Sequence, residues 1–181
     1  MKKLSPGSMA AAAGMSAAVA LLMLFSAGIT RFAALSVVCL FVASLMTWIP
    51  LREESGYVWA LLEFASVTLL SLLISRGSVY TYLYILLFGP YAIERYFLRT
   101  HIGDRLLTVL IRFLILNVMA ASGIAFAEFV LEIDVLSYLP ETPVLFQIGL
   151  LEGVFGIFML LFKVFSLLFD SVIRNVLLPR R

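Results

Sequence analysis

Apolar residues fill most of this chain, in six runs that short polar or charged turns separate. Each run holds about 17 to 28 residues, and a run of this length with few charges is typical of a membrane-spanning helix. The turns between the first four runs are short, so the pattern predicts one compact all-α membrane domain over residues 1–181. The predicted spans are 9–29, 31–50, 57–75, 78–94, 106–131 and 144–171.

The composition supports a membrane protein with almost no soluble part. Hydrophobic residues make up 63% of the chain and charged residues 13%, whereas a soluble domain is nearer ~45–50% and ~25%. The net charge of +2 is too small to suggest nucleic acid, and one cysteine and one histidine exclude an internal disulfide and a histidine metal cluster. We expect no metal and no cofactor. The first apolar run exceeds a signal peptide's usual ~7–15 residues, so we assign it as the first span.

The basic residues predict the orientation, because Lys and Arg concentrate in cytoplasmic loops. With the N-terminus inside, the outer side carries only Arg31 and Arg76, and the outer loop 131–143 is acidic without a base. We therefore predict both termini in the cytoplasm and a multi-pass protein of the inner (cytoplasmic) membrane. The cytoplasmic side carries Lys2, Lys3, Arg52, Arg95, Arg99, Arg105, Arg180 and Arg181. The basic loop after the fourth span either contacts lipid head groups or forms a docking surface for a partner.

Several ionisable and polar residues lie inside the predicted spans, where they are costly and usually face a bundle interior, a partner or a site. Lys163, Asp170 and Arg174 share one face of the last span at spacings of seven and four. Such residues predict an inner polar network with Arg112, Lys163 or Arg174 opposite Asp170 and Glu63. The network is either structural pairing or a proton path. Its members are Glu63, Tyr91, Glu94, Arg112, Asn117, Lys163, Asp170 and Arg174.

The outer half predicts a different site. Tyr80, Tyr84, Phe88 and Tyr91 follow helical spacing and share one face of the fourth span. Acids and an amide on the last two spans suggest a pocket for a cationic or hydroxylated ring, formed by stacking and hydrogen bonding. The alternative is an interfacial aromatic belt. The predicted substrate-binding residues are Tyr80, Tyr84, Glu128, Gln147 and Glu152.

The first span carries small residues four apart, a spacing that lets another helix approach closely. Gly149 and Gly153 repeat the pattern in the last span. One such face would serve internal packing, and two suggest that one of them meets another subunit. The candidate docking residues are Ala10, Ala13, Gly14 and Ala17.

Three segments, "LLFGPYAIERYF" (86–97), "LIRFLILN" (110–117) and "LLFDSVIRNVL" (167–177), are similar to those of an S-component-like family. S components are the substrate-binding membrane subunits of energy-coupling-factor (ECF) transporters. The matching residues are Phe88, Gly89, Tyr91, Asn117 and Asp170. The order of Pro90 and Tyr91 is reversed relative to the family, and Arg112 replaces a lysine.

The resemblance implies a subunit without enzymatic activity that binds a vitamin-like small molecule from the outer side. Its first span, Ala13 and Ala17 especially, would dock on the transmembrane coupling subunit, and two ATPase subunits would drive uptake. The chain itself has no Gly-rich nucleotide-binding motif. The competing interpretation is a non-transporting scaffold subunit of a cell-shape or envelope complex, whose intramembrane charges would bind partner helices. A membrane enzyme is disfavoured, since no nucleophile stands beside a base and no acidic metal motif occurs.

Overall fold

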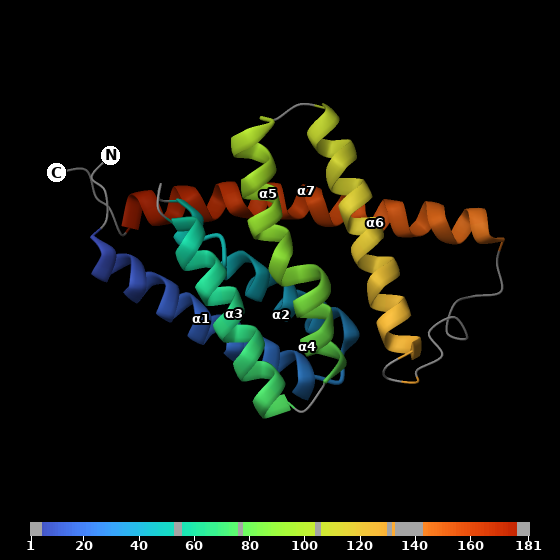
Figure 1. The fold of residues 1–181 in the computed structure, drawn as a ribbon, viewed down its shortest axis with the longest axis horizontal. Helices are drawn as coiled ribbons and strands as arrows, with labels where there is room; N and C mark the ends of the chain where they lie inside the picture. Colours follow the sequence, from blue (N-terminus) through green and yellow to red (C-terminus); the bar gives the residue numbers. More distant parts are fainter. Residues whose placement is uncertain are drawn as a thin grey trace. The chain divides into compact units, whose positions relative to one another are not determined.

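A computed structural model describes residues 5–52, 56–75, 78–103, 106–129, 132 and 143–176 of the chain. All elements of this described part are helical, and Figure 1 shows them coloured along the chain. The chain divides into two compact units, residues 1–125 and 126–181. The elements are α1 (Pro6–Ile29), α2 (Ala33–Met46), the 3-10 turn η1 (Pro50–Arg52), α3 (Gly56–Ser75), α4 (Val79–Leu83), the π-helical segment η2 (Tyr84–Phe88), α5 (Gly89–His101), α6 (Leu106–Phe129) and α7 (Val144–Val176).

Four helices, α1, α3, α6 and α7, are long and apolar enough to cross a membrane. They make the chain a multi-pass membrane protein. The other two predicted spans differ from the expectation. Helix α2 has 14 residues, so it is about 21 Å long at ~1.5 Å per residue, short of a hydrocarbon core of ~30 Å. The fourth predicted span is divided into α4, η2 and the charged helix α5.

Helix α1 is the centre of the first unit and packs against both α2 and α3. Its start is defined by Ser5, whose hydroxyl accepts a hydrogen bond from the Ser8 amide at 3.3 Å, and by Pro6 in the first turn. The buried side of α1 carries mostly small side chains, which allow the neighbouring helices to approach closely. Its buried residues are Met9, Ala13, Ser16, Ala20, Leu24 and Ala27.

The outward sides of the helices are apolar, as a lipid environment requires. On α3, Leu69 and Leu73 are 61% and 75% exposed, while Glu63 and Ser71 face the interior. This reverses the usual arrangement of a soluble helix, in which the apolar face is the buried one. A soluble monomer rarely exposes so much apolar surface, so the inverted pattern agrees with a membrane protein.

The π segment joins α4 and α5 into one continuous helical stretch (Figure 1). Pro90 has no amide proton, so the α-helical hydrogen bond to the carbonyl four residues earlier cannot form. The Gly89 amide instead donates to the Tyr84 carbonyl, five residues back. From α2, the Ser44 hydroxyl donates to the Phe88 carbonyl. This bond shows how a neighbouring helix satisfies backbone groups at an irregular turn within a membrane.

Helix α6 buries a single stripe, Thr108, Arg112 and Leu116, with a spacing of four. In the second unit, α7 has 33 residues, and its candidate membrane span covers Leu145–Phe169. A Cβ added at Gly149 or Gly153 would meet no atom within 4 Å. The small-residue stripe of the last predicted span therefore makes no close contact at these two positions with the described residues of the second unit.

Gly89 is required by the close approach of α3 to the π segment. A Cβ at this position would lie 2.4 Å from Phe64 Cε2 and 2.7 Å from Phe64 Cδ2. We expect Gly89→Ala to lower the free energy of unfolding by about 1–3 kcal/mol, because the Phe64 ring must move. Thermal unfolding in detergent would measure the change.

Gly28→Ala is the matched control, because a Cβ there meets nothing within 4 Å. Alanine should stabilise that helical position by up to ~1 kcal/mol. Equal melting temperatures for the two variants would contradict the close approach at Gly89.

Candidate functional site

A carboxyl group lies at the centre of the α1–α3 interface. Glu63 of α3 is only 2% exposed. The Ser16 hydroxyl of α1 lies 2.7 Å from Glu63 Oε2, and it is also 3.0 Å from the Ala13 carbonyl oxygen. Glu63 Oε1 is buried and has no hydrogen-bond partner among the described residues. An incompletely satisfied buried carboxyl in a membrane segment is a strong indication of function.

A second hydroxyl group, that of Tyr84, lies within electrostatic range of this carboxyl, and a third, that of Thr47, lies beside Tyr84. Tyr84 of the π segment is completely buried. The Tyr84 ring packs at 5.9 Å from the Phe64 ring. Ser16, Thr47, Glu63 and Tyr84, here called the Glu63 cluster, therefore come from four different segments of the first unit.

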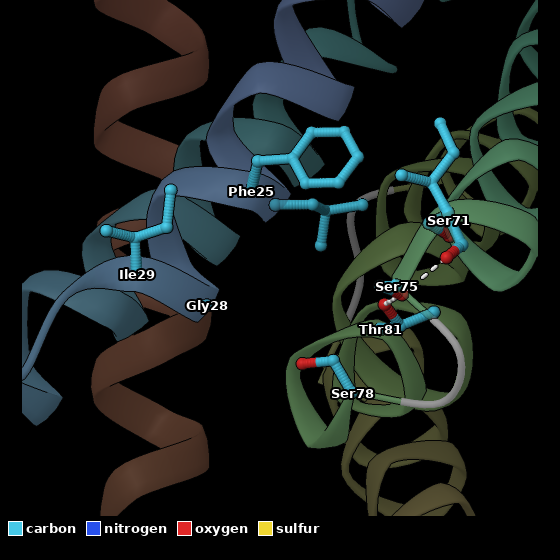
Figure 2. A pocket seen from close by; sticks show the side chains of 9 residues that line it. Phe25, Gly28, Ile29, Ser71, Ser75, Ser78 and Thr81 are labelled. Carbon is cyan, nitrogen blue, oxygen red and sulfur yellow. Dashed lines mark hydrogen bonds between the residues drawn. The ribbon is translucent and has the colours of Figure 1, made fainter.

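A crevice opens between the C-terminal end of α1 and the α3–α4 hairpin. Its volume is about 280 Å³, near the lower end of the ~300–1,000 Å³ usual for ligand sites. Figure 2 shows Phe25, Gly28 and Ile29 on the α1 side and the hydroxyl side chains on the opposite side. The lining residues are Leu24, Phe25, Gly28, Ile29, Ser71, Ile74, Ser75, Ser78 and Thr81.

The crevice is polar on one wall and apolar on the other. Ser75 Oγ and Thr81 Oγ1 are hydrogen-bonded at 2.7 Å, and the Ser75 hydroxyl also donates to the Ser71 carbonyl. None of the described lining residues carries a charge. This arrangement offers hydroxyl donors and acceptors together with an aromatic ring, a combination suited to a small uncharged molecule with a few polar groups.

A second polar cluster surrounds the start of α5. The carboxyl of Glu94 is buried and lies within electrostatic range of Arg112 and Arg95. Tyr91 is fully buried within range of the same three residues. Arg95 also places its guanidinium carbon 5.5 Å from the centre of the Trp48 ring, a cation–π contact.

The structure groups only some members of the predicted inner network. Tyr91, Glu94 and Arg112 come together, whereas Glu63 is bound to Ser16 rather than to any of the bases that the sequence suggested. Asn117 makes a local bond, since its amide donates to the Phe113 carbonyl at 2.9 Å. In the second unit, Lys163 is exposed. The side chains of Asp170 and Arg174 lie outside the described residues.

The predicted substrate-binding residues are divided between the two units. Tyr80 is half-buried, and Tyr84 faces the core of the first unit. The remaining three, Glu128, Gln147 and Glu152, belong to the second unit, where each is half-buried.

The candidate docking residues on α1 do not all face the same way. Ala13 is only 6% exposed and packs inside the first unit. Gly14 is exposed, and Ala10 and Ala17 are half-buried. A Cβ added at Gly14 would meet no atom within 4 Å. The open part of the small-residue stripe therefore centres on Gly14, while Ala13 serves internal packing.

The sequence analysis did not single out Ser16, Thr47, Arg95 or the crevice hydroxyls as site residues. Ser71 and Ser75 do carry a signal, because their spacing of four places both hydroxyls on one side of α3, and Ser78 follows at the start of α4. No three His, Cys, Asp or Glu side chains in the described ranges come together as a metal site.

No known protein family, no curated protein and no solved structure matches the chain. The candidate sites are therefore defined by their geometry alone.

The Ser16–Glu63 hydrogen bond yields a stability prediction. Ser16→Ala leaves the buried carboxyl without its partner, so we expect the free energy of unfolding to fall by about 1–3 kcal/mol. Ser66→Ala is the control on α3, since Ser66 is exposed and its hydroxyl donates locally to the Leu62 carbonyl. Denaturant unfolding in detergent would measure both. A Ser16→Ala variant as stable as Ser66→Ala would contradict a structural role for this bond.

Proposed function

We propose that this protein is the substrate-binding subunit of an ECF-type importer for a vitamin-like micronutrient. In this proposal it captures the solute from the outer side of the membrane and docks on a transmembrane coupling subunit. The observation that carries the proposal is the crevice at the ends of α1, α3 and α4. Under the orientation that the basic residues predict, this end of the helices faces outward.

The chemistry of the crevice narrows the solute class. Ser71, Ser75, Ser78 and Thr81 supply hydroxyl groups, and Phe25 supplies a ring for stacking. Because none of the described residues that line the crevice is charged, an ionic solute would find no counter-charge among them, which is unfavourable. The crevice therefore favours an uncharged, partly apolar molecule with hydroxyl or amide groups. The sequence suggested either a cationic or a hydroxylated ring as the solute. The hydroxylated ring fits this crevice better than the cationic one.

The open stripe around Gly14 supports the docking half of the proposal. A helix of the coupling subunit can approach the α1 backbone most closely where side chains are smallest, at Gly14 and its half-buried neighbours Ala10 and Ala17. Gly14 lies 14 residues before Gly28, which is about 21 Å along a helix at ~1.5 Å per residue. Solute capture and docking would thus use two separate positions on one helix, the crevice at its C-terminal end and the stripe around Gly14 nearer its middle.

The two roles can be tested separately on α1, because Gly14 and Gly28 are both exposed and both have open space at the Cβ position. We expect Gly28→Leu to fill the crevice and to lower retention of the solute about tenfold or more, a loss of at least ~1.4 kcal/mol of binding free energy. Native mass spectrometry of the protein purified from its own cells in mild detergent would measure retention. Gly14→Leu is the matched control and should retain the solute.

Ser75→Ala tests the same crevice in a second way, because it removes a polar contact without adding volume.

A wild-type protein that is purified without a solute but with another membrane protein bound would favour the scaffold interpretation. Retention that is equal in wild type and Gly28→Leu would place the solute outside the crevice.

For binding of the coupling subunit, we expect the opposite effects of the same two variants, Gly14→Leu and Gly28→Leu. Gly14→Leu inserts a branched side chain where a partner helix would pack, so co-purification of the coupling subunit and its two ATPase subunits should be lost. Gly28→Leu should keep the complex intact. Quantitative mass spectrometry of the purified complex would compare the variants, with thermal unfolding to show that both bundles remain folded. Normal co-purification of Gly14→Leu would rule out docking through this stripe.

A further inference from the structure

We propose that Glu63 is a proton-binding site, a function separate from solute capture and independent of it. The Glu63 cluster uses a carboxyl that is almost completely removed from solvent, and one of its oxygens has no donor among the described residues. The ligand is the proton itself, held by Glu63 Oε2 and shared with the Ser16 hydroxyl.

The geometry around Ser16 can accommodate a protonated carboxyl. Ser16 Oγ is 2.7 Å from Glu63 Oε2 and 3.0 Å from the Ala13 carbonyl oxygen. A hydroxyl has one proton, so it can donate to only one of these two acceptors. When Glu63 is protonated, its own proton is donated to Ser16, and the Ser16 proton is donated to Ala13. Both contacts are then hydrogen bonds. When Glu63 is ionised, Ser16 must donate its proton to the carboxylate. The contact between Ser16 Oγ and the Ala13 carbonyl oxygen is then no longer a hydrogen bond.

In the described part of the chain, no basic side chain offsets an ionised Glu63. The groups that face it are Ser16 from α1 and, from the π segment, the titratable Tyr84, beside Thr47 at the end of α2. Among the described residues no Lys, Arg or His is hydrogen-bonded or electrostatically coupled to Glu63. An isolated carboxylate without a counter-charge is strongly unfavourable in an apolar interior. A bound proton removes that charge.

The route for the proton runs along the α1–α3 interface to the crevice. Leu24 and Ser71 belong to the crevice lining, Ala20 and Val67 form the next layer inward, and Ser16 and Glu63 form the layer below. The crevice and the carboxyl are thus eight residues apart, about 12 Å along a helix. Ala20 and Val67 are both fully buried. Helices α1 and α3 must therefore separate locally before the proton on Glu63 can exchange with solvent. The rate of proton exchange then depends on how often these two helices separate.

Infrared spectroscopy of the whole protein in detergent tests the proposal, because the C=O stretch of a protonated carboxyl is distinct from that of a carboxylate. The wild type should show a protonated-carboxyl band at neutral pH. Glu63→Gln, which keeps shape and hydrogen bonding to Ser16, should remove the Glu63 contribution and so weaken this band, while any contribution from the buried carboxyl of Glu94 remains. Glu132→Gln is the control, since Glu132 is exposed and its replacement should leave the band unchanged. A band of equal intensity in wild type and Glu63→Gln would overturn the proposal.

Two further measurements keep the test decisive. If Glu63→Gln does not fold, Glu63→Asp retains a carboxyl in a changed position and should shift the band; an unshifted band would overturn the proposal. Replacing choline chloride by sodium chloride at constant pH should leave the wild-type band unchanged. A sodium-dependent loss of the band would identify a sodium site in place of a proton site, and it would equally overturn the proposal.

Discussion

The hydrogen bond between Ser16 and Glu63 is the interaction on which the rest of the first unit depends. Burying a carboxyl between two apolar helices is favourable only if a partner and close packing accompany it. Small side chains on α1, Ala13 and Ala20 on either side of Ser16, allow α3 to come close enough for a 2.7 Å contact. The same seam continues to the crevice, where Leu24 and Ser71 belong to the lining. The α1–α3 interface therefore contains both the Ser16–Glu63 hydrogen bond in its middle and part of the crevice lining at its end.

The π segment positions the remaining part of the Glu63 cluster. Pro90 removes an α-helical hydrogen bond, and the wider turn before it is completed by the bond from Gly89 to the Tyr84 carbonyl. As a result, the Tyr84 side chain lies in the core, where it packs against Phe64 and is within electrostatic range of Glu63. Gly89 is part of the same arrangement, since any side chain there would collide with the Phe64 ring. An irregular backbone at membrane depth is thus stabilised by packing and by the Ser44 hydroxyl.

The sequence predicts where the long helices of this protein lie better than it predicts which side of each helix faces the core, the lipid or a ligand. The starts and ends of α1, α3, α6 and α7 follow from the lengths of the apolar runs, and the common face of Tyr84, Phe88 and Tyr91 follows from their spacing, since all three are buried. The role of that face does not follow, because periodicity cannot tell a core from a ligand pocket. Ser16 was not recognised as the partner of Glu63 for a related reason. Lipid and core are both apolar, so polarity does not show which side of α1 faces inward, and the alanine spacing points equally to packing and to docking.

Three features meet on α1: the crevice near its end, the bond to Glu63 in its middle, and the open surface at Gly14. A helix is stiff along its axis, so a displacement of α1 relative to α3 alters the crevice and the carboxyl together. Protonation changes the cost of separating the two helices, because an ionised Glu63 gains far more hydration free energy than a neutral one when the α1–α3 interface opens. A partner bound at Gly14 would act on the same rigid element. The three features therefore share one helix, and any coupling between them would act through α1.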